Sequence, residues 1–185
     1  MKYDPQKIIQ IALSEVGYQE KETNAFLDHD TINAGDENYT KYARDLDAMN
    51  FYNGKKNGYA WCDVFVDWCF VAAFGEKDAL RLTFQPSFFL LNRGAGCRYS
   101  YGYYQDEGRI FAEPEVGDQV FFYASDGETI CHTGLVWAVD DTYVYTVEGN
   151  TSPQDGVVEN GGAVCKKKYL LTDPRLAGYG RPNYI

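Results

Sequence analysis

The sequence is poor in basic residues. It has 17 Lys and Arg against 27 Asp and Glu, which gives a formal net charge of −10. Nucleic-acid binding requires a basic footprint, so this balance argues against nucleic acid as a partner. Long-range electrostatics would not draw the chain to an anionic cell surface either. Contact with such a surface would need specific contacts, cations or another module.

Long apolar runs and a leader segment are also missing. The sequence contains no stretch of eighteen apolar residues, so no membrane span is predicted. The first five residues lack the charged and apolar segments of a signal peptide. We therefore expect a chain that stays where it is made, is exported without a signal, or has had a signal removed.

Cysteine and histidine are few and show no metal-binding spacing. The five cysteines are Cys62, Cys69, Cys97, Cys131 and Cys165. Because their number is odd, at least one thiol stays free, and none belongs to a C-x-x-C pair. The only two histidines, His29 and His132, belong to no zinc-ligand pattern, so no zinc cofactor is expected.

Calcium is the one cation that the sequence leaves open. The polar segment 28–38 carries several carboxylates around His29, and oxygen ligands of this kind could hold calcium. Their order lacks the D-x-D-x-D-G pattern of a calcium loop. We therefore favour a solvated acidic loop and interpret His29 as a surface histidine.

The fold class follows from a change of hydrophobic period along the chain. At 185 residues, the chain fits one domain spanning residues 1–185. Helical periodicity precedes Pro114, and β-strand patterns follow it. The predicted helical segments are 8–16, 39–49, the stretch from Cys62, and a more irregular part over 75–113. The predicted strands are 118–123, 132–139, 143–148 and 163–165, with Pro182 favouring a sheet edge at the end. The pattern predicts an α+β fold in which N-terminal helices pack on a C-terminal antiparallel sheet.

Cys62 stands where a turn-rich loop meets an almost wholly apolar helix. The loop 53–58 contains two Asn-Gly pairs, so the helix is predicted to begin at Cys62. The unpaired amides and the dipole at a helix start favour negative charge, and hence a thiolate. Two interpretations remain open from this stretch alone. Cys62 is either a nucleophile or one more small buried residue, as Cys69 is expected to be.

A thiol nucleophile needs a base and a third group that orients the base. His132 begins one predicted strand, and the next strand ends with Glu148 and Asn150 on one face. A two-residue hairpin loop at 140–141 would turn Glu148 away from His132, whereas a three-residue loop would set the two side chains opposite each other. If the carboxylate orients the imidazole, the hairpin must contain a loop with an odd number of residues, or a bulge.

Four segments of the sequence resemble the CHAP domain. They are Tyr59–Cys62, Pro114–Phe122, His132–Val136 and Tyr145–Thr151. CHAP domains are cysteine- and histidine-dependent amidohydrolases and peptidases of the papain-like NlpC/P60 group. The resemblance implies a papain-like fold and cleavage of bacterial peptidoglycan, as phage endolysins and bacterial autolysins perform. Both an N-acetylmuramoyl-L-alanine amidase and a stem or cross-bridge endopeptidase remain open.

The resemblance also implies residue roles. By match to the family's motif, Cys62 would be the nucleophile, His132 the base, and Glu148 with Asn150 the orienting pair. Many family members carry glutamine before the cysteine, where this sequence has Trp61. The donor to the oxyanion is therefore open between the Cys62 backbone amide and the Tyr59 hydroxyl. Tyr59 and Trp61 are the residues expected on the substrate side.

Two rival functions remain from the sequence. An aromatic content of 16% would also suit a non-catalytic module that binds cell wall or glycan. A transpeptidase or toxin could use the same triad and pass the thioester to an amine other than water. If the chain is a wall hydrolase, a separate cell-wall-binding domain is an expected partner, since the catalytic fold fills the 185 residues.

Overall fold

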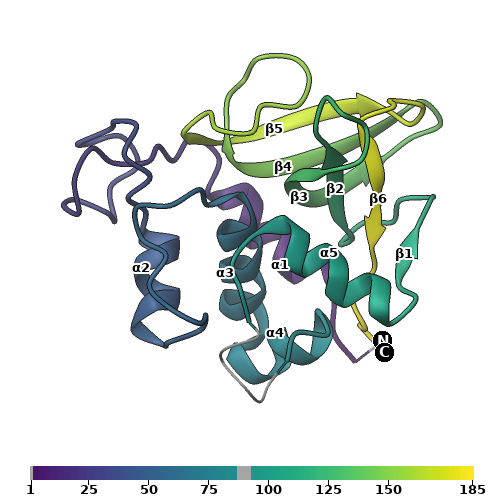
Figure 1. The fold of residues 1–185 in the computed structure, drawn as a ribbon, viewed down its shortest axis with the longest axis horizontal. Coiled ribbons are helices and arrows are strands. Elements are labelled where there is room, and N and C mark those ends of the chain that lie inside the picture. The colour runs from purple at the N-terminus through teal and green to yellow at the C-terminus, as the bar shows by residue number, and fades with distance from the viewer. Residues whose placement is uncertain (1, 87–92) are drawn as a thin grey trace.

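The computed structural model describes residues 2–86 and 93–185. Within them, five helices lie against one six-stranded antiparallel sheet (Figure 1). The helices are α1 (Pro5–Ser14), α2 (Lys41–Ala48), α3 (Cys62–Phe74), α4 (Glu76–Leu82) and α5 (Cys97–Asp106). The strands are β1 (Ile110–Phe111), β2 (Gln119–Tyr123), β3 (Ile130–Val139), β4 (Tyr143–Thr151), β5 (Ala163–Leu170) and β6 (Leu176–Gly180). This arrangement confirms the predicted α+β fold and is consistent with a papain-like fold.

Helix α3 occupies the centre of the helical layer. It lies between α2 and α5 in Figure 1 and contacts α1, α2, α4, and strands β3 and β4. Its side chains Phe65, Val66 and Phe70 are fully buried, as expected for a helix that is apolar on every side. The prediction that this helix begins at Cys62 is confirmed. The helix start is thus held rigidly between the other helices and the sheet.

The β3–β4 hairpin contains the predicted irregularity. Leu135 pairs with Val147, but beyond a register shift at Trp137 the pairing passes to Ala138 and Tyr145. The bulge confirms the prediction that this hairpin departs from a regular two-residue loop. If the pairing of Leu135 with Val147 is continued by one residue, Gly134 lies opposite Glu148. His132 is two residues from Gly134, so its side chain lies on the same face of the sheet as that of Glu148 and diagonal to it. The directly opposite placement expected for a simple three-residue loop is not the one found, because the strands pair Val139 with Val144 at the turn and the bulge shifts this register by only one residue.

Two further expectations need correction. The irregular segment 75–113 resolves into α4, α5 and β1, and its residues 87–92 lie outside the described part of the chain. The end of the chain does not form the sheet edge, because β6 pairs with both β1 and β2 in the order β1-β6-β2-β3-β4-β5. Pro182 follows β6, where its missing N–H interrupts no ladder. The short strand β1 takes the edge instead.

The two ends of the chain lie together (Figure 1). The backbone N–H groups of Lys2 and Tyr3 both donate to the carbonyl of Tyr184, with N···O distances of 3.0 and 3.1 Å. The Tyr184 hydroxyl in turn donates to the carbonyl of Gly117, which ties this end to the turn before β2. Among the described residues, no helix has the length and apolar character needed to cross a bilayer.

Candidate active site

Cys62 is the first residue of α3 and is 7% exposed. Trp61 occupies the position before the helix and makes no side-chain capping bond to it. No capping side chain therefore occupies the amides of the first turn, which favour an anion at this point. The sequence placed the cysteine correctly at the start of a buried helix.

The side chain of Trp61 points into the core. It is fully buried, packs against the rings of Tyr18 and Tyr42, and donates its indole N–H to Glu20 Oε2 at 2.6 Å. Burial raises the pKa of Glu20, while the bond from Trp61 acts in the opposite direction. An aromatic pocket with a carboxylate inside it suits an indole better than solvent does, because the ring packs against other rings and its N–H is paired. Of the two residues expected on the substrate side, only Tyr59 lies at the surface, with 66% of it exposed.

The hairpin brings His132 and Glu148 into direct contact. Both side chains are fully buried, and His132 Nε2 lies 2.9 Å from Glu148 Oε2. The carboxylate also accepts hydrogen bonds from the hydroxyls of Thr146 and Tyr169. A glycine opposite makes room for it, because a Cβ added at Gly134 would lie 2.5 Å from Glu148 Cγ. The carboxylate is therefore fixed from three sides and orients the imidazole through Nε2.

The other ring nitrogen of the histidine remains available. His132 Nδ1 is buried and has no hydrogen-bond partner among residues 2–86 and 93–185. Asn150 is also fully buried and has φ 54°, with its side-chain oxygen 3.4 Å from the Gly162 N–H and its amide nitrogen unpaired within the described chain. Glu148 is the group bound to the imidazole, whereas the side-chain oxygen of Asn150 accepts from the backbone at Gly162.

A buried carboxylate joins the two sides of the site. Asp63, directly after Cys62, accepts hydrogen bonds from the Gly96 N–H at 3.0 Å and from the Ser100 hydroxyl at 2.9 Å. Its other oxygen accepts from Gln119 Nε2, which also lies 3.1 Å from the Thr133 hydroxyl. Burial raises the pKa of Asp63, and these three donors oppose the rise. Since Thr133 directly follows the histidine, one network links the starts of α3 and α5 to β2 and β3.

Sequence reasoning missed this network and a second cysteine. Cys97 is a neighbour of Cys62, and the Cys62 thiol, followed by burial, raises the pKa of Cys97. Two signals were available in the sequence. Asp63 is one of two charged residues in a largely apolar helix, and Cys97 follows a glycine-rich turn, as Cys62 does.

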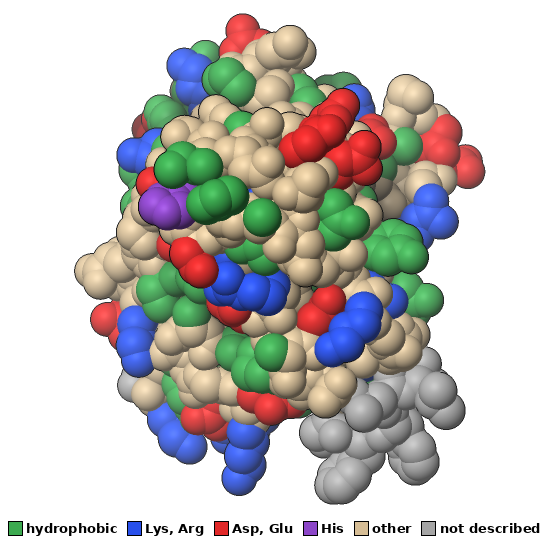
Figure 2. Space-filling model, turned by 90° about the vertical axis from the view of Figure 1, so that its left-hand side faces the viewer, with side chains coloured by type: hydrophobic (Ala, Val, Ile, Leu, Met, Phe, Trp, Pro, Cys, Tyr) green, Lys and Arg blue, Asp and Glu red, His purple; other side chains and the backbone are tan. Residues whose placement is uncertain are grey.

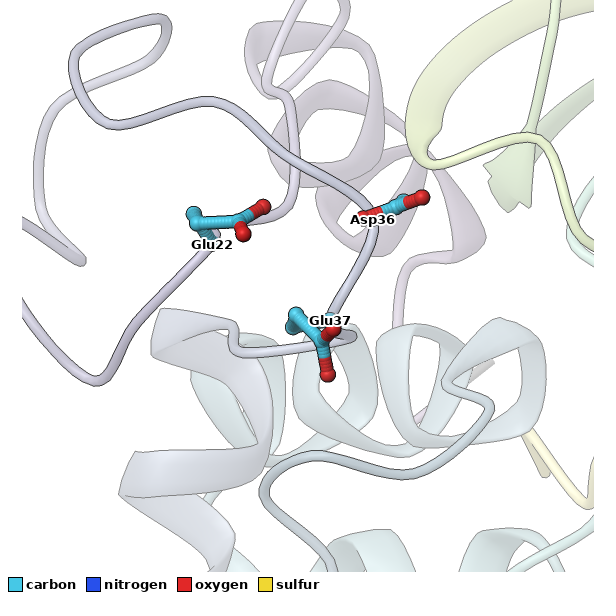
Figure 3. Close-up of side chains that lie close together, drawn as sticks. All are labelled: Glu22, Asp36 and Glu37. Carbon is cyan, nitrogen blue, oxygen red and sulfur yellow. The ribbon is translucent and has the colours of Figure 1, made fainter.

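The carboxylates that lie together in the acidic loop are not the set that the sequence suggested. Glu22, Asp36 and Glu37 are exposed, and their ligand atoms lie within 4.8 Å of one another (Figure 3). Asp28 is engaged elsewhere, because both its oxygens accept hydrogen bonds from Arg44, which lowers the pKa of Asp28. Within segment 28–38, Asp36 and Glu37 therefore lie together with Glu22, whereas Asp28 pairs with Arg44.

His29 lies at the surface, as predicted. His29 is exposed, whereas His132 is fully buried. Figure 2 shows a face of the molecule on which a histidine side chain lies beside hydrophobic side chains. The ring of His29 lies 6.3 Å from that of Phe26, which is 60% exposed. It therefore plays no part in the group around Cys62.

Comparison with protein families agrees with this geometry. The family model described as the CHAP domain matches residues 54–150, slightly more than half of the chain. The chain belongs to the CHAP domain family. CHAP domains are typically cysteine- and histidine-dependent amidohydrolases, so membership supports a hydrolase that acts on peptidoglycan. The matched segment contains Cys62, His132, Glu148 and Asn150. A search of curated proteins gave no match for the chain.

Proposed function

We propose that this CHAP domain cleaves an amide bond of bacterial peptidoglycan through a thioester on Cys62. The observation that carries the proposal is the buried contact between His132 Nε2 and Glu148, which leaves Nδ1 free to serve a nucleophile. The product chemistry is that of an N-acetylmuramoyl-L-alanine amidase or of a stem or cross-bridge endopeptidase. Such an enzyme acts as a phage endolysin or as a bacterial autolysin, reaching the wall after release from a host or by secretion.

The proposed mechanism divides the reaction into two steps. The Cys62 thiolate attacks the amide carbonyl, and the His132 imidazolium gives its proton to the departing amine. Water then hydrolyses the thioester, with His132 acting as the base. Glu148 keeps the imidazole in one tautomer and orientation and stabilises the imidazolium. Neither of these two reaction steps requires a metal ion.

The oxyanion requires a donor near the start of α3. The backbone N–H of Cys62 is the first candidate, because no capping side chain competes at this helix start. The exposed hydroxyl of Tyr59 is the second. Replacing Tyr59 by Phe distinguishes the two candidate donors, because it removes the hydroxyl and leaves the backbone N–H of Cys62. A fall in kcat of about 10²–10³ would identify the hydroxyl as a donor, whereas an unchanged kcat assigns the role to the backbone.

The decisive experiment is mass spectrometry of peptidoglycan fragments after digestion with the wild type and with Cys62→Ala. New L-alanine amino termini with intact stem peptides indicate an amidase, and shortened stems indicate an endopeptidase. Cys62→Ala should release no fragments, while Cys69→Ala should still release them, because that thiol is buried two turns further along α3.

The same digestion tests the rival functions. A wall-binding module would leave walls from several bacteria unchanged, and its binding would survive Cys62→Ala. Fragments tagged by an added amine would instead indicate a transpeptidase, in which an amine captures the thioester before water does. Either result would contradict the proposed hydrolase.

A further inference from the structure

The site contains a second thiol beside the proposed nucleophile. Cys97 begins α5 as Cys62 begins α3, and each is 7% exposed. The two cysteines are neighbours, because the residue before Cys97 donates its N–H to the residue after Cys62, and the Cys62 thiol acts on the pKa of Cys97. All five cysteines are free in the structure, so both of these thiols are reduced.

The backbone around the two cysteines is already docked. Asp63, which follows Cys62, accepts the N–H of Gly96, which precedes Cys97, at 3.0 Å. The hydroxyl of Ser100, one turn further along α5, donates to the same carboxylate oxygen at 2.9 Å. Two adjacent bonds thus hold the helix starts together, so joining the sulfurs would not require the helices to approach from a distance.

The opposite side of Cys97 is closed by the sheet. Its sulfur lies 3.8 Å from the carbonyl of Ile130, two residues before His132. The thiol therefore sits between the nucleophile and the strand that carries the base. It is not a surface cysteine that happens to lie near the site.

The remaining cysteines are engaged elsewhere. Cys69 is fully buried inside α3, two turns from its start. Cys131 lies 3.8 Å from an Arg175 guanidinium nitrogen, and Cys165 lies on β5. Neither of these two is fully buried, which makes Cys131 a matched control for thiol oxidation.

We propose that Cys62 and Cys97 form a reversible oxidation site, in which a peroxide converts the two thiols to a disulfide and so switches off the nucleophile. The inference rests on the proposed function only in taking Cys62 as the nucleophile. The modification itself is a property of the two neighbouring sulfurs.

The chemistry balances with the peroxide as the only oxidant. The Cys62 thiolate attacks one peroxide oxygen, the O–O bond breaks, and Cys62 becomes a sulfenic acid while hydroxide, or an alkoxide, leaves and takes up a proton. The Cys97 sulfur then attacks the Cys62 sulfur and expels the hydroxyl group, which departs as water with the Cys97 proton. Two electrons pass from the sulfurs to the peroxide. A small thiol or a phosphine returns them when it reduces the disulfide.

The two thiols are suited to different steps. The neighbouring Cys62 thiol, and then burial, raises the pKa of Cys97, which favours the protonated form of Cys97. Only one sulfur then competes for the peroxide, and the other resolves the product. A resolving thiol next to a reactive one protects the reactive one from irreversible oxidation to a sulfinic acid.

The test treats the intact protein with graded hydrogen peroxide, followed by alkylation and peptide mass spectrometry without reductant. The wild type should yield a peptide pair linked through Cys62 and Cys97, and wall hydrolysis should fall in proportion to the linked fraction and return with reductant. Cys97→Ala should give no linked pair, and its loss of activity should become irreversible as Cys62 reaches the sulfinic acid. The wall-hydrolysis rate of each variant after peroxide is divided by the rate of the same variant under reductant.

Controls make each outcome decisive. Cys131→Ser should still form the linked pair, and Cys97→Ser replaces Cys97→Ala if circular dichroism shows that the alanine variant is unfolded. Sulfinic acid at Cys62 of the wild type without a linked peptide, or a link to another cysteine, would overturn the proposal. A linked peptide in a protein that leaves walls intact would overturn the proposed function but retain the oxidation site.

Discussion

The two halves of the candidate site are held in place by different means. The helical half positions Cys62 through side-chain hydrogen bonds to a buried carboxylate, Asp63. The sheet half positions His132 through strand register, a bulge at Trp137 and the space left by a glycine. A buried polar network fails when one partner is removed, whereas a strand fails when its register moves. The comparison therefore predicts different responses to substitution in the two halves.

A second buried carboxylate extends the helical half. Asp67, one turn after Asp63, accepts the hydroxyl of Tyr52 and the side-chain amide of Gln85, both at 2.6 Å. Burial and then the charge of Asp63 raise the pKa of Asp67 well above its ordinary value. In the sheet half, the buried carboxylate of Glu148 faces an imidazole instead of a second acid.

The largest effect is expected in the sheet half, from Glu148→Gln. The amide cannot reproduce two acceptor oxygens, so it disfavours the tautomer that leaves His132 Nδ1 free to act as the base. We expect kcat to fall by about 10³–10⁴ with little change in the thermal midpoint. Wall-hydrolysis kinetics beside a melting curve check this. Tyr169→Phe removes only one weaker donor at 3.2 Å and serves as the control. A loss of folding equal to the loss of activity would contradict an orienting role.

Asp63→Ala should break the helical half by destabilising it. The substitution leaves the donors of Gly96, Ser100 and Gln119 without their buried acceptor. We expect a loss of about 2–4 kcal/mol in unfolding free energy, measured by urea denaturation. Ser100→Ala removes one donor only and should cost about 1 kcal/mol. Equal costs for the two variants would show that Asp63 is not the centre of the network.

Asp67→Asn should change how stability depends on pH. Since the folded pKa of Asp67 is raised, its neutral form stabilises the fold below the ordinary aspartate pKa, and this contribution is lost as pH rises toward the folded value. Asparagine stays neutral, so stability of the variant relative to the wild type should increase over that window. Unfolding midpoints from pH 4 upward provide the measurement. A constant difference across the range would mean that Asp67 does not titrate there.

The smallest effect is expected from Trp61→Phe, at the junction of the two halves. The ring still packs on Tyr18 and Tyr42, but the buried oxygen of Glu20 loses the indole donor. We expect a cost of about 1 kcal/mol in stability and an unchanged KM for wall fragments. A raised KM at unchanged stability would instead place the Trp61 side chain in contact with substrate.

The parts of the site that the sequence revealed are those with local patterns. The start of α3 at Cys62 followed from turn residues and an apolar run, and the bulge in the hairpin followed from the alternation of side chains between His132 and Glu148. Partners brought together from distant segments left no such pattern. Cys97 and Gln119 meet the start of α3 only through tertiary packing, which local periodicity does not report.

Partners that lie far along the chain account for two further differences from the sequence-based expectations. Trp61 follows an exposed loop, yet the position of its indole is decided by Glu20, forty-one residues earlier. Segment 28–38 appeared to collect carboxylates, but Arg44 engages Asp28, and Glu22 joins Asp36 and Glu37 from outside the segment. In both cases a partner far along the chain determined the outcome.

The adjacency of the chain ends at Tyr184 has a consequence for engineering. Because the amides of Lys2 and Tyr3 hold the carbonyl of Tyr184, a short peptide could join the ends and the chain could be reopened in an exposed loop. A cargo fused to either end would leave from the same point on the surface. Its tether would then have the same reach toward a surface-bound ligand from either terminus.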